Sequence, residues 1–157
     1  MGQKGLLLAI MAISLVAAST WVGWRMLNGG SGGGASWEGH GLRFELNVGL
    51  EGRLLIVDMT VENVASEPIT LVFRTSQIWD VEVKDSGGHV LWRWSSDKVF
   101  LQAIQYRELA PGEEMTFQTE WEAPGPGHYV VVGYFMGHIG DLHGLRPPPL
   151  SFHVDIS

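Results

Sequence analysis

The sequence predicts an all-β protein: an immunoglobulin-like antiparallel β-sandwich of about eight strands, preceded by an N-terminal transmembrane helix or signal segment. Three observations lead to this prediction. Beyond residue 40, apolar residues alternate with polar ones at a period of two, which is typical of half-buried strands. Turn signals rich in glycine, proline and asparagine recur at intervals of roughly ten residues. Residues 6–24, by contrast, contain no charged side chain.

Eight alternating segments follow one another along the chain. In the first, every second residue from Leu42 to Val48 is apolar, and the residues between them are mostly charged or polar. Residues 95–108 show no clear period, and we expect a long connection with a short helical turn there. The expected strands are 42–48, 53–63, 69–73, 79–83, 90–94, 115–121, 129–135 and 150–156, and the clearest turns are 63–68, 85–88, 110–113 and 124–127.

Residues 1–27 are expected to form a membrane anchor or a signal segment. A helix over the uncharged run 6–24 would be about 28 Å long, close to the thickness of the hydrocarbon layer. Trp21 and Trp24 favour an uncleaved anchor, because aromatic side chains gather at the membrane interface. The small residues around Ala18 leave open a signal peptide that is cleaved there.

The stretch 28–39 is rich in glycine and serine and predicts a flexible linker. We therefore expect one folded domain over residues 40–157. An apolar span, a linker and a domain together predict a cell-membrane protein with an extracytoplasmic domain, or a secreted one if the signal is cleaved. The basic charge at the N-terminus places that end inside.

Composition narrows the classes of function. The formal net charge is −7 and the basic residues are scattered, so we expect no nucleic-acid partner. The chain has no cysteine, which excludes disulfides, thiolate metal sites and a cysteine nucleophile. Its Gly-x-Ser-x-Gly match, Gly29–Gly33, falls in the glycine- and serine-rich stretch 28–39 and not on a strand-to-helix turn, and no glycine-rich phosphate loop is placed before a helix. We expect a monomeric domain that is no enzyme and uses no cofactor.

Four short motifs between residues 76 and 103 carry a resemblance to a known family. They are Ser76-Gln77-Ile78-Trp79-Asp80, Asp85-Ser86-Gly87-Gly88, Leu91-Trp92-Arg93-Trp94-Ser95 and Phe100-Leu101-Gln102-Ala103. This region resembles the intracellular proteinase inhibitor (BsuPI-type) family of small all-β bacterial domains, and the likeness covers roughly residues 42–135. The resemblance implies the same sandwich fold and a protein partner that is a protease. The activity for which the family is named is intracellular, whereas the N-terminal segment here predicts export.

The strand that carries Trp92, Arg93 and Trp94 allows two interpretations. In the first, both indoles point into the core and Arg93 points outward. In the second, one indole and Arg93 form an exposed anchor for a partner, since tryptophan and arginine are over-represented at binding hot spots. Polar residues of the motifs are expected to bind backbone groups and to pin the connection 95–108 to the sheet; they are Gln77, Asp80, Ser95 and Gln102.

Two loops are long enough to present a binding edge. The connection 95–108 carries Arg107, and the loop 136–149 ends at Arg146 followed by three prolines that stiffen the chain. We favour the loop 136–149 as the partner-facing one, because its glycines leave it free to adapt. His138, Asp141 and His143 lie in the same loop; they could bind Zn²⁺ or Cu²⁺, but we expect a solvated loop without a metal.

The sequence thus predicts an exported, membrane-tethered, proteinase-inhibitor-like binding module. The alternative is a structural or interaction module at the cell surface without inhibitory activity. The candidate partner-facing residues are Trp92, Arg93, Arg107, His138, Asp141, His143 and Arg146.

Overall fold

A computed structural model describes residues 32–157, which fold into antiparallel sheets. The prediction of an all-β domain is confirmed. The described strands are β1 (Gly32–Gly39), β2 (Leu42–Glu51), β3 (Leu54–Asn63), β4 (Ile69–Phe73), β5 (Trp79–Asp85), β6 (Val90–Arg93), β7 (Gln105–Leu109), β8 (Glu114–Glu122), β9 (Gly127–Phe135), β10 (His138–Ile139) and β11 (Leu150–Ile156), with a 3₁₀ turn, η1, at Trp94–Asp97.

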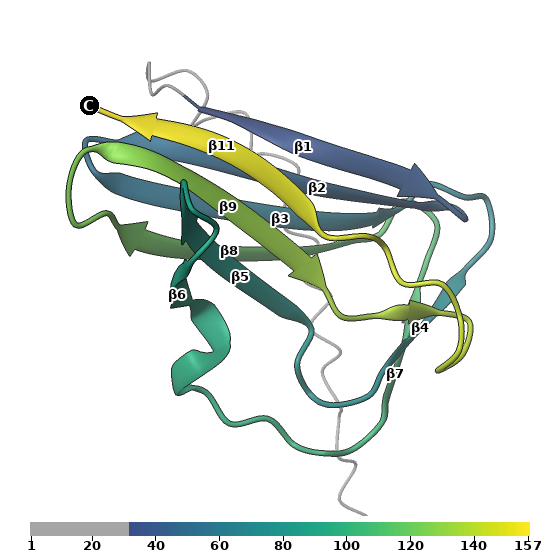
Figure 1. The fold of residues 1–157 in the computed structure, drawn as a ribbon. Helices are drawn as coiled ribbons and strands as arrows, with labels where there is room; N and C mark the ends of the chain where they lie inside the picture. The colour runs from purple at the N-terminus through teal and green to yellow at the C-terminus, as the bar shows by residue number, and fades with distance from the viewer. Residues whose placement is uncertain (1–31) are drawn as a thin grey trace, which may run out of the picture.

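Two four-stranded sheets form the layers of the sandwich. The order is β1-β2-β3-β8 in one sheet and β11-β9-β5-β6 in the other, and Figure 1 shows the second in front of the first. A smaller sheet, β10-β4-β7, lies at one end. The core fills the space between the layers: Phe44 from β2 and Trp79 from β5 both contact Phe135 from β9, at centroid distances of 6.2 and 5.1 Å.

Alternation explains which side chains reach this core. The even positions of β2 from Leu42 to Val48 are buried, and the residues between them are half-buried on the other face. In β5 the residues Trp79, Val81 and Val83 belong to the core cluster. Trp92 and Trp94 are half-buried and pack against that cluster, and Arg93 between them pairs with Asp80 and Glu82 on the other face, as the first interpretation expects.

Strand β1 was not expected. Residues 32–39 pair with β2 from Gly32↔Gly49 to Gly39↔Leu42, so the linker prediction does not hold for this part of 28–39. The small residues permit close packing: a Cβ on Gly33 would stand 2.5 Å from the ring of Phe152 in β11. Ala35 and Trp37 pack against the core cluster from this strand.

The predicted membrane helix over 6–24 lies outside the described residues, as does the cleavage site near Ala18. Between residues 32 and 157 no helix is long and apolar enough to cross a membrane.

Candidate binding surface

The surface begins where β6 runs into η1 and the chain leaves the front sheet. Trp94 anchors this point, with its ring edge-on to Phe117 at 4.9 Å and tilted against Phe100 at 6.1 Å. Lys98 places its ammonium 4.6 Å from the centre of the Trp94 ring. These contacts hold the start of the connection that leads to β7.

Two serines fix the path of that connection. The Ser95 backbone N–H and hydroxyl donate to Asp80 at 3.2 and 2.7 Å. Further on, Leu101 exchanges two hydrogen bonds with Ser76: its carbonyl accepts from the Ser76 N–H at 3.0 Å, and its own N–H donates to the Ser76 hydroxyl at 2.9 Å. The expectation that Asp80 and Ser95 pin the connection is confirmed.

The other two residues expected to pin the connection act locally. Gln77 donates to the Trp79 carbonyl, two residues away, and Gln102 donates to the Phe100 carbonyl at 3.4 Å. Ser76 takes the role that we expected of the glutamines.

The pinned connection exposes apolar side chains. In the stretch from Lys98 to Tyr106, which we call the 98–106 segment, four large apolar residues face solvent: Val99 is 98% exposed, Leu101 70%, Ile104 49% and Tyr106 72%. An exposed apolar group on a fixed backbone is a common feature of protein interaction sites. The sequence alone did not indicate these four residues as candidate binding residues. The signal that could have indicated them is the presence of four large apolar side chains in a stretch without a regular period.

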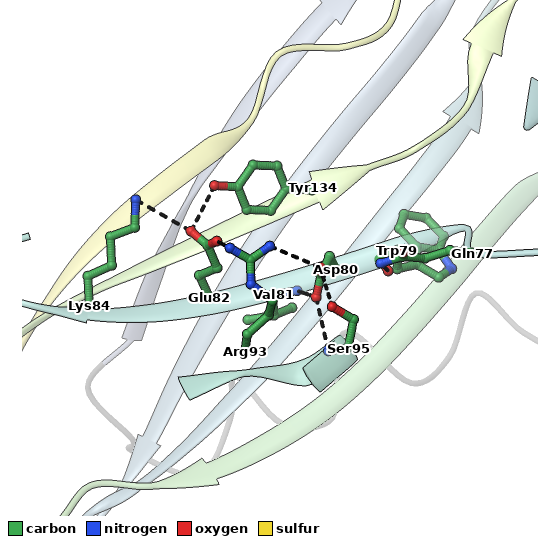
Figure 2. A network of polar contacts seen from close by, with 9 residues as sticks. All are labelled: Gln77, Trp79, Asp80, Val81, Glu82, Lys84, Arg93, Ser95 and Tyr134. Atoms are coloured by element: carbon green, nitrogen blue, oxygen red, sulfur yellow. Dashed lines mark hydrogen bonds and ion pairs between the residues drawn. The ribbon is translucent and has the colours of Figure 1, made fainter. Parts of the chain in front are cut away.

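A network of charged groups lies beside η1 on the outward positions of β5 (Figure 2). Asp80 and Glu82 are 5% and 4% exposed although they alternate with core residues, because other side chains cover them. Arg93 forms ion pairs with both carboxylates, the one with Asp80 at 3.7 Å. The Glu82 carboxylate lies 3.4 Å from the Lys84 ammonium and accepts a hydrogen bond of 2.9 Å from the Tyr134 hydroxyl.

Burial and the neighbouring Glu82 carboxylate raise the pKa of the Tyr134 phenol to about 12, since both disfavour a phenolate. The hydroxyl therefore stays a hydrogen-bond donor throughout the neutral range.

Arg93 is therefore committed to this network rather than free to anchor a partner. Its side chain remains 45% exposed, however, and it lines an open pocket of about 280 Å³ together with Arg146. The other lining residues are Asp80, Glu82, Tyr134 and Met136. The structure thus brings together two of the predicted site residues, Arg93 and Arg146, from distant parts of the chain.

The remaining predicted residues stand apart. Arg107 lies on β7, 3.8 Å from Glu113. His138 lies on β10, where its Nδ1 is 3.0 Å from the Gly144 carbonyl, and the Asp141 carboxylate accepts from the His143 backbone N–H at 2.7 Å. Within the described part of the chain, no three His, Asp or Glu side chains are grouped as a metal site.

The loop 136–149 is held more firmly than its glycines suggest. Gly140 donates to the Thr70 carbonyl, Ile139 to the Leu145 carbonyl and Arg74 to the Leu142 carbonyl. Close packing requires glycine at position 144, because a Cβ on Gly144 would stand 1.8 Å from the Ile139 carbonyl oxygen. The expectation that this loop is free to adapt does not fit these contacts.

Among curated proteins there is no match. Among solved structures, β-glucosidase 3B from Thermotoga neapolitana, in complex with α-D-glucose, is similar at 18% identity and a TM-score of 0.37. The match covers 80% of this chain but only 16% of the glucosidase, and at that TM-score it does not define a common fold.

A family model described as BsuPI, intracellular proteinase inhibitor, matches residues 42–139, well over half of the chain. The match extends from β2 to β10 and includes the pinned connection and the charged network. The word intracellular contradicts the extracytoplasmic, membrane-tethered location that residues 6–24 suggested, and that prediction is wrong by this comparison. The recognised motifs and the family match agree, and the chain belongs to the BsuPI family of intracellular proteinase inhibitors.

Proposed function

We propose that this protein is a proteinase-inhibitor-like binding module without catalytic activity, and that the 98–106 segment is the surface it presents to a protease. The observation that carries the proposal is the combination of exposure and restraint in this segment. Val99 and Leu101 are 98% and 70% exposed, yet the backbone of Leu101 is tied to Ser76 by two hydrogen bonds.

Restraint matters because an inhibitor must occupy a protease cleft without being reordered by it. A segment that is already held loses little conformational entropy on binding, so more of the contact energy appears as affinity. Burial of Val99, Leu101 and Tyr106 against a partner would then supply the apolar contribution.

The pairing of the charged groups near η1 supports the choice of the 98–106 segment over the charged network as the binding surface. Asp80, Glu82 and Arg93 satisfy one another and the neighbouring Ser95 and Tyr134, so they hold the surface in place instead of offering free groups. Arg146 and the pocket beside it form a second, polar edge, which we assign to the rim of the interface.

The test compares two surface variants, one on each loop, in a panel of serine, cysteine and metalloproteases. Val99→Asp with Leu101→Asp places charges on the 98–106 segment without touching its pinning hydrogen bonds. Leu145→Asp places one on the other loop, at a residue 44% exposed. We expect the first variant to lose inhibition of a protease that the wild-type protein inhibits, and the second to retain it.

The opposite pattern would assign the interface to the loop 136–149. Failure of the wild-type protein to inhibit or bind any member of the panel would overturn the inhibitor function. Binding without inhibition would support the alternative, a plain interaction module. Equal thermal unfolding temperatures of the three proteins are the control for folding.

A further inference from the structure

A second feature of the molecule lies on the outward face of the front sheet, away from the 98–106 segment. His128 in β9 and His153 in β11 place their rings 5.2 Å apart, with His128 Nε2 at 3.0 Å from His153 Nδ1. Asp155, the direct cross-strand partner of His128, has its carboxylate 2.7 Å from His128 Nδ1. We propose that His128 and His153 together bind a divalent transition-metal ion of the kind that prefers imidazole, with Cu²⁺ bound most tightly.

The spacing of the two nitrogens suits a shared metal ion. Nitrogen ligands stand about 2.0–2.1 Å from Zn²⁺, and similar distances hold for Cu²⁺. Two such ligands are then about 2.9 Å apart at a right angle and about 3.4 Å apart at a tetrahedral angle. The observed 3.0 Å between His128 Nε2 and His153 Nδ1 falls inside this interval.

Asp155 prepares one of the two ligands. Its carboxylate accepts a hydrogen bond from His128 Nδ1, which leaves the lone pair of Nε2 on the side of His153. Metal-binding histidines commonly donate their second N–H to a carboxylate in this way, and the contact fixes the ring and makes the free nitrogen more basic. For His153 to ligate, its proton moves from Nδ1 to Nε2, with no net gain or loss of protons.

The sheet holds the pair in register. β9 and β11 are paired from Gly127↔Ile156 to Gly133↔Leu150, so the backbones under both histidines are fixed. The side chains are accessible, with His128 38% and Asp155 88% exposed, and water can complete the coordination shell. Two protein ligands with open positions make a surface site, and the negative net charge of the chain favours a cation there.

The chain supplies a matched control. His89 also contacts a carboxylate through its Nδ1, which lies 3.1 Å from Asp85, as His128 does with Asp155. Unlike His128, it has no second imidazole paired with it among the described residues. His89→Gln therefore removes a histidine–carboxylate pair without removing the proposed chelate.

The experiment titrates the full-length chain, without a histidine tag, with Cu²⁺ alone, and measures affinity by calorimetry and the ligands by electron paramagnetic resonance. We expect one saturable site with two imidazole nitrogens, a loss of affinity of roughly tenfold or more in His128→Gln and in His153→Gln, and a smaller loss in Asp155→Asn. His89→Gln should bind as the wild-type protein does.

Wild-type affinity in the double variant His128→Gln with His153→Gln would overturn the proposal, as would the absence of a saturable wild-type site. Loss of binding in His143→Gln instead would place the ion on the loop 136–149 and would overturn it as well. Circular dichroism and thermal unfolding without metal check that each variant folds.

Discussion

The hydroxyl of Ser95 and the carboxylate of Asp80 form a hydrogen bond of 2.7 Å across 15 residues of sequence, between η1 and the start of β5. The same carboxylate accepts from the backbone N–H of Ser95 and from that of Val81. One buried acidic group thus joins the front sheet to the start of the connection that carries the 98–106 segment.

Ser95→Ala should destabilise the protein by about 1.5–3 kcal/mol, because a hydrogen bond to a charged, buried carboxylate is lost. It should also reduce inhibition, since the start of the 98–106 segment loses one restraint. Chemical denaturation measures the first effect. Ser96→Ala is the control, because Ser96 is the exposed neighbour, and an equal loss there would contradict the role of Asp80.

Trp94→Ala should cost about 2–3 kcal/mol of unfolding free energy, less than the about 3–5 kcal/mol expected for Trp79→Ala. Trp79 is 7% exposed in the core, whereas Trp94 is half-buried and packs on Phe117 and Phe100 at the rim. Denaturant melts of the two variants give the comparison. A larger cost for Trp94 would mean that the connection depends on this ring more than its burial implies.

The stability of the protein should fall as the pH rises from about 10 to about 12. The folded state holds the pKa of Tyr134 at about 12, above the value of about 10 in an unfolded chain. A raised phenol pKa stabilises the fold fully below the unfolded value and ceases to do so above the folded value. Tyr134→Phe lacks this component, so its unfolding free energy should depend less on pH over the same window. Identical pH profiles would refute the assignment.

Gly144→Ala should destabilise the loop 136–149 and lower the stability by about 1–3 kcal/mol, because the added methyl group meets a backbone oxygen that cannot move away easily. Gly125→Ala is the control, since a Cβ there meets nothing within 4 Å. Hydrogen exchange of Gly140 and Ile139 amides localises the effect. A neutral Gly144 variant would show that the loop is as adaptable as its composition suggests.

Much of the front and back sheets could be predicted from alternation alone, because one face of each strand is buried. Val81 and Val83, for example, occupy the core positions that their period predicts. The strands that were missed lack this signal for physical reasons. Most of β1 has no large side chain to alternate, and Gln105–Glu108 of β7 are exposed on both faces.

The candidate site was predictable only in part. The motif residues Asp80 and Ser95 indicated a link between β5 and the connection, since short polar side chains in a strand that runs into a loop need partners. Nothing local in the sequence places Tyr134 over Glu82 or His128 beside His153, because those pairs are created by the register of β9 against β5 and β11.

The glycine-rich strand β1 determines where a truncated fragment of the protein has to begin. Residues 32–39 precede the family match, and a truncation chosen from that match would start at residue 42. Such a fragment would leave the backbone of β2 unpaired along one side and uncover the core beneath Ala35 and Trp37. An open strand of this length invites pairing between molecules. Fragments that begin before Gly32 should stay monodisperse, whereas those that begin at residue 42 should aggregate.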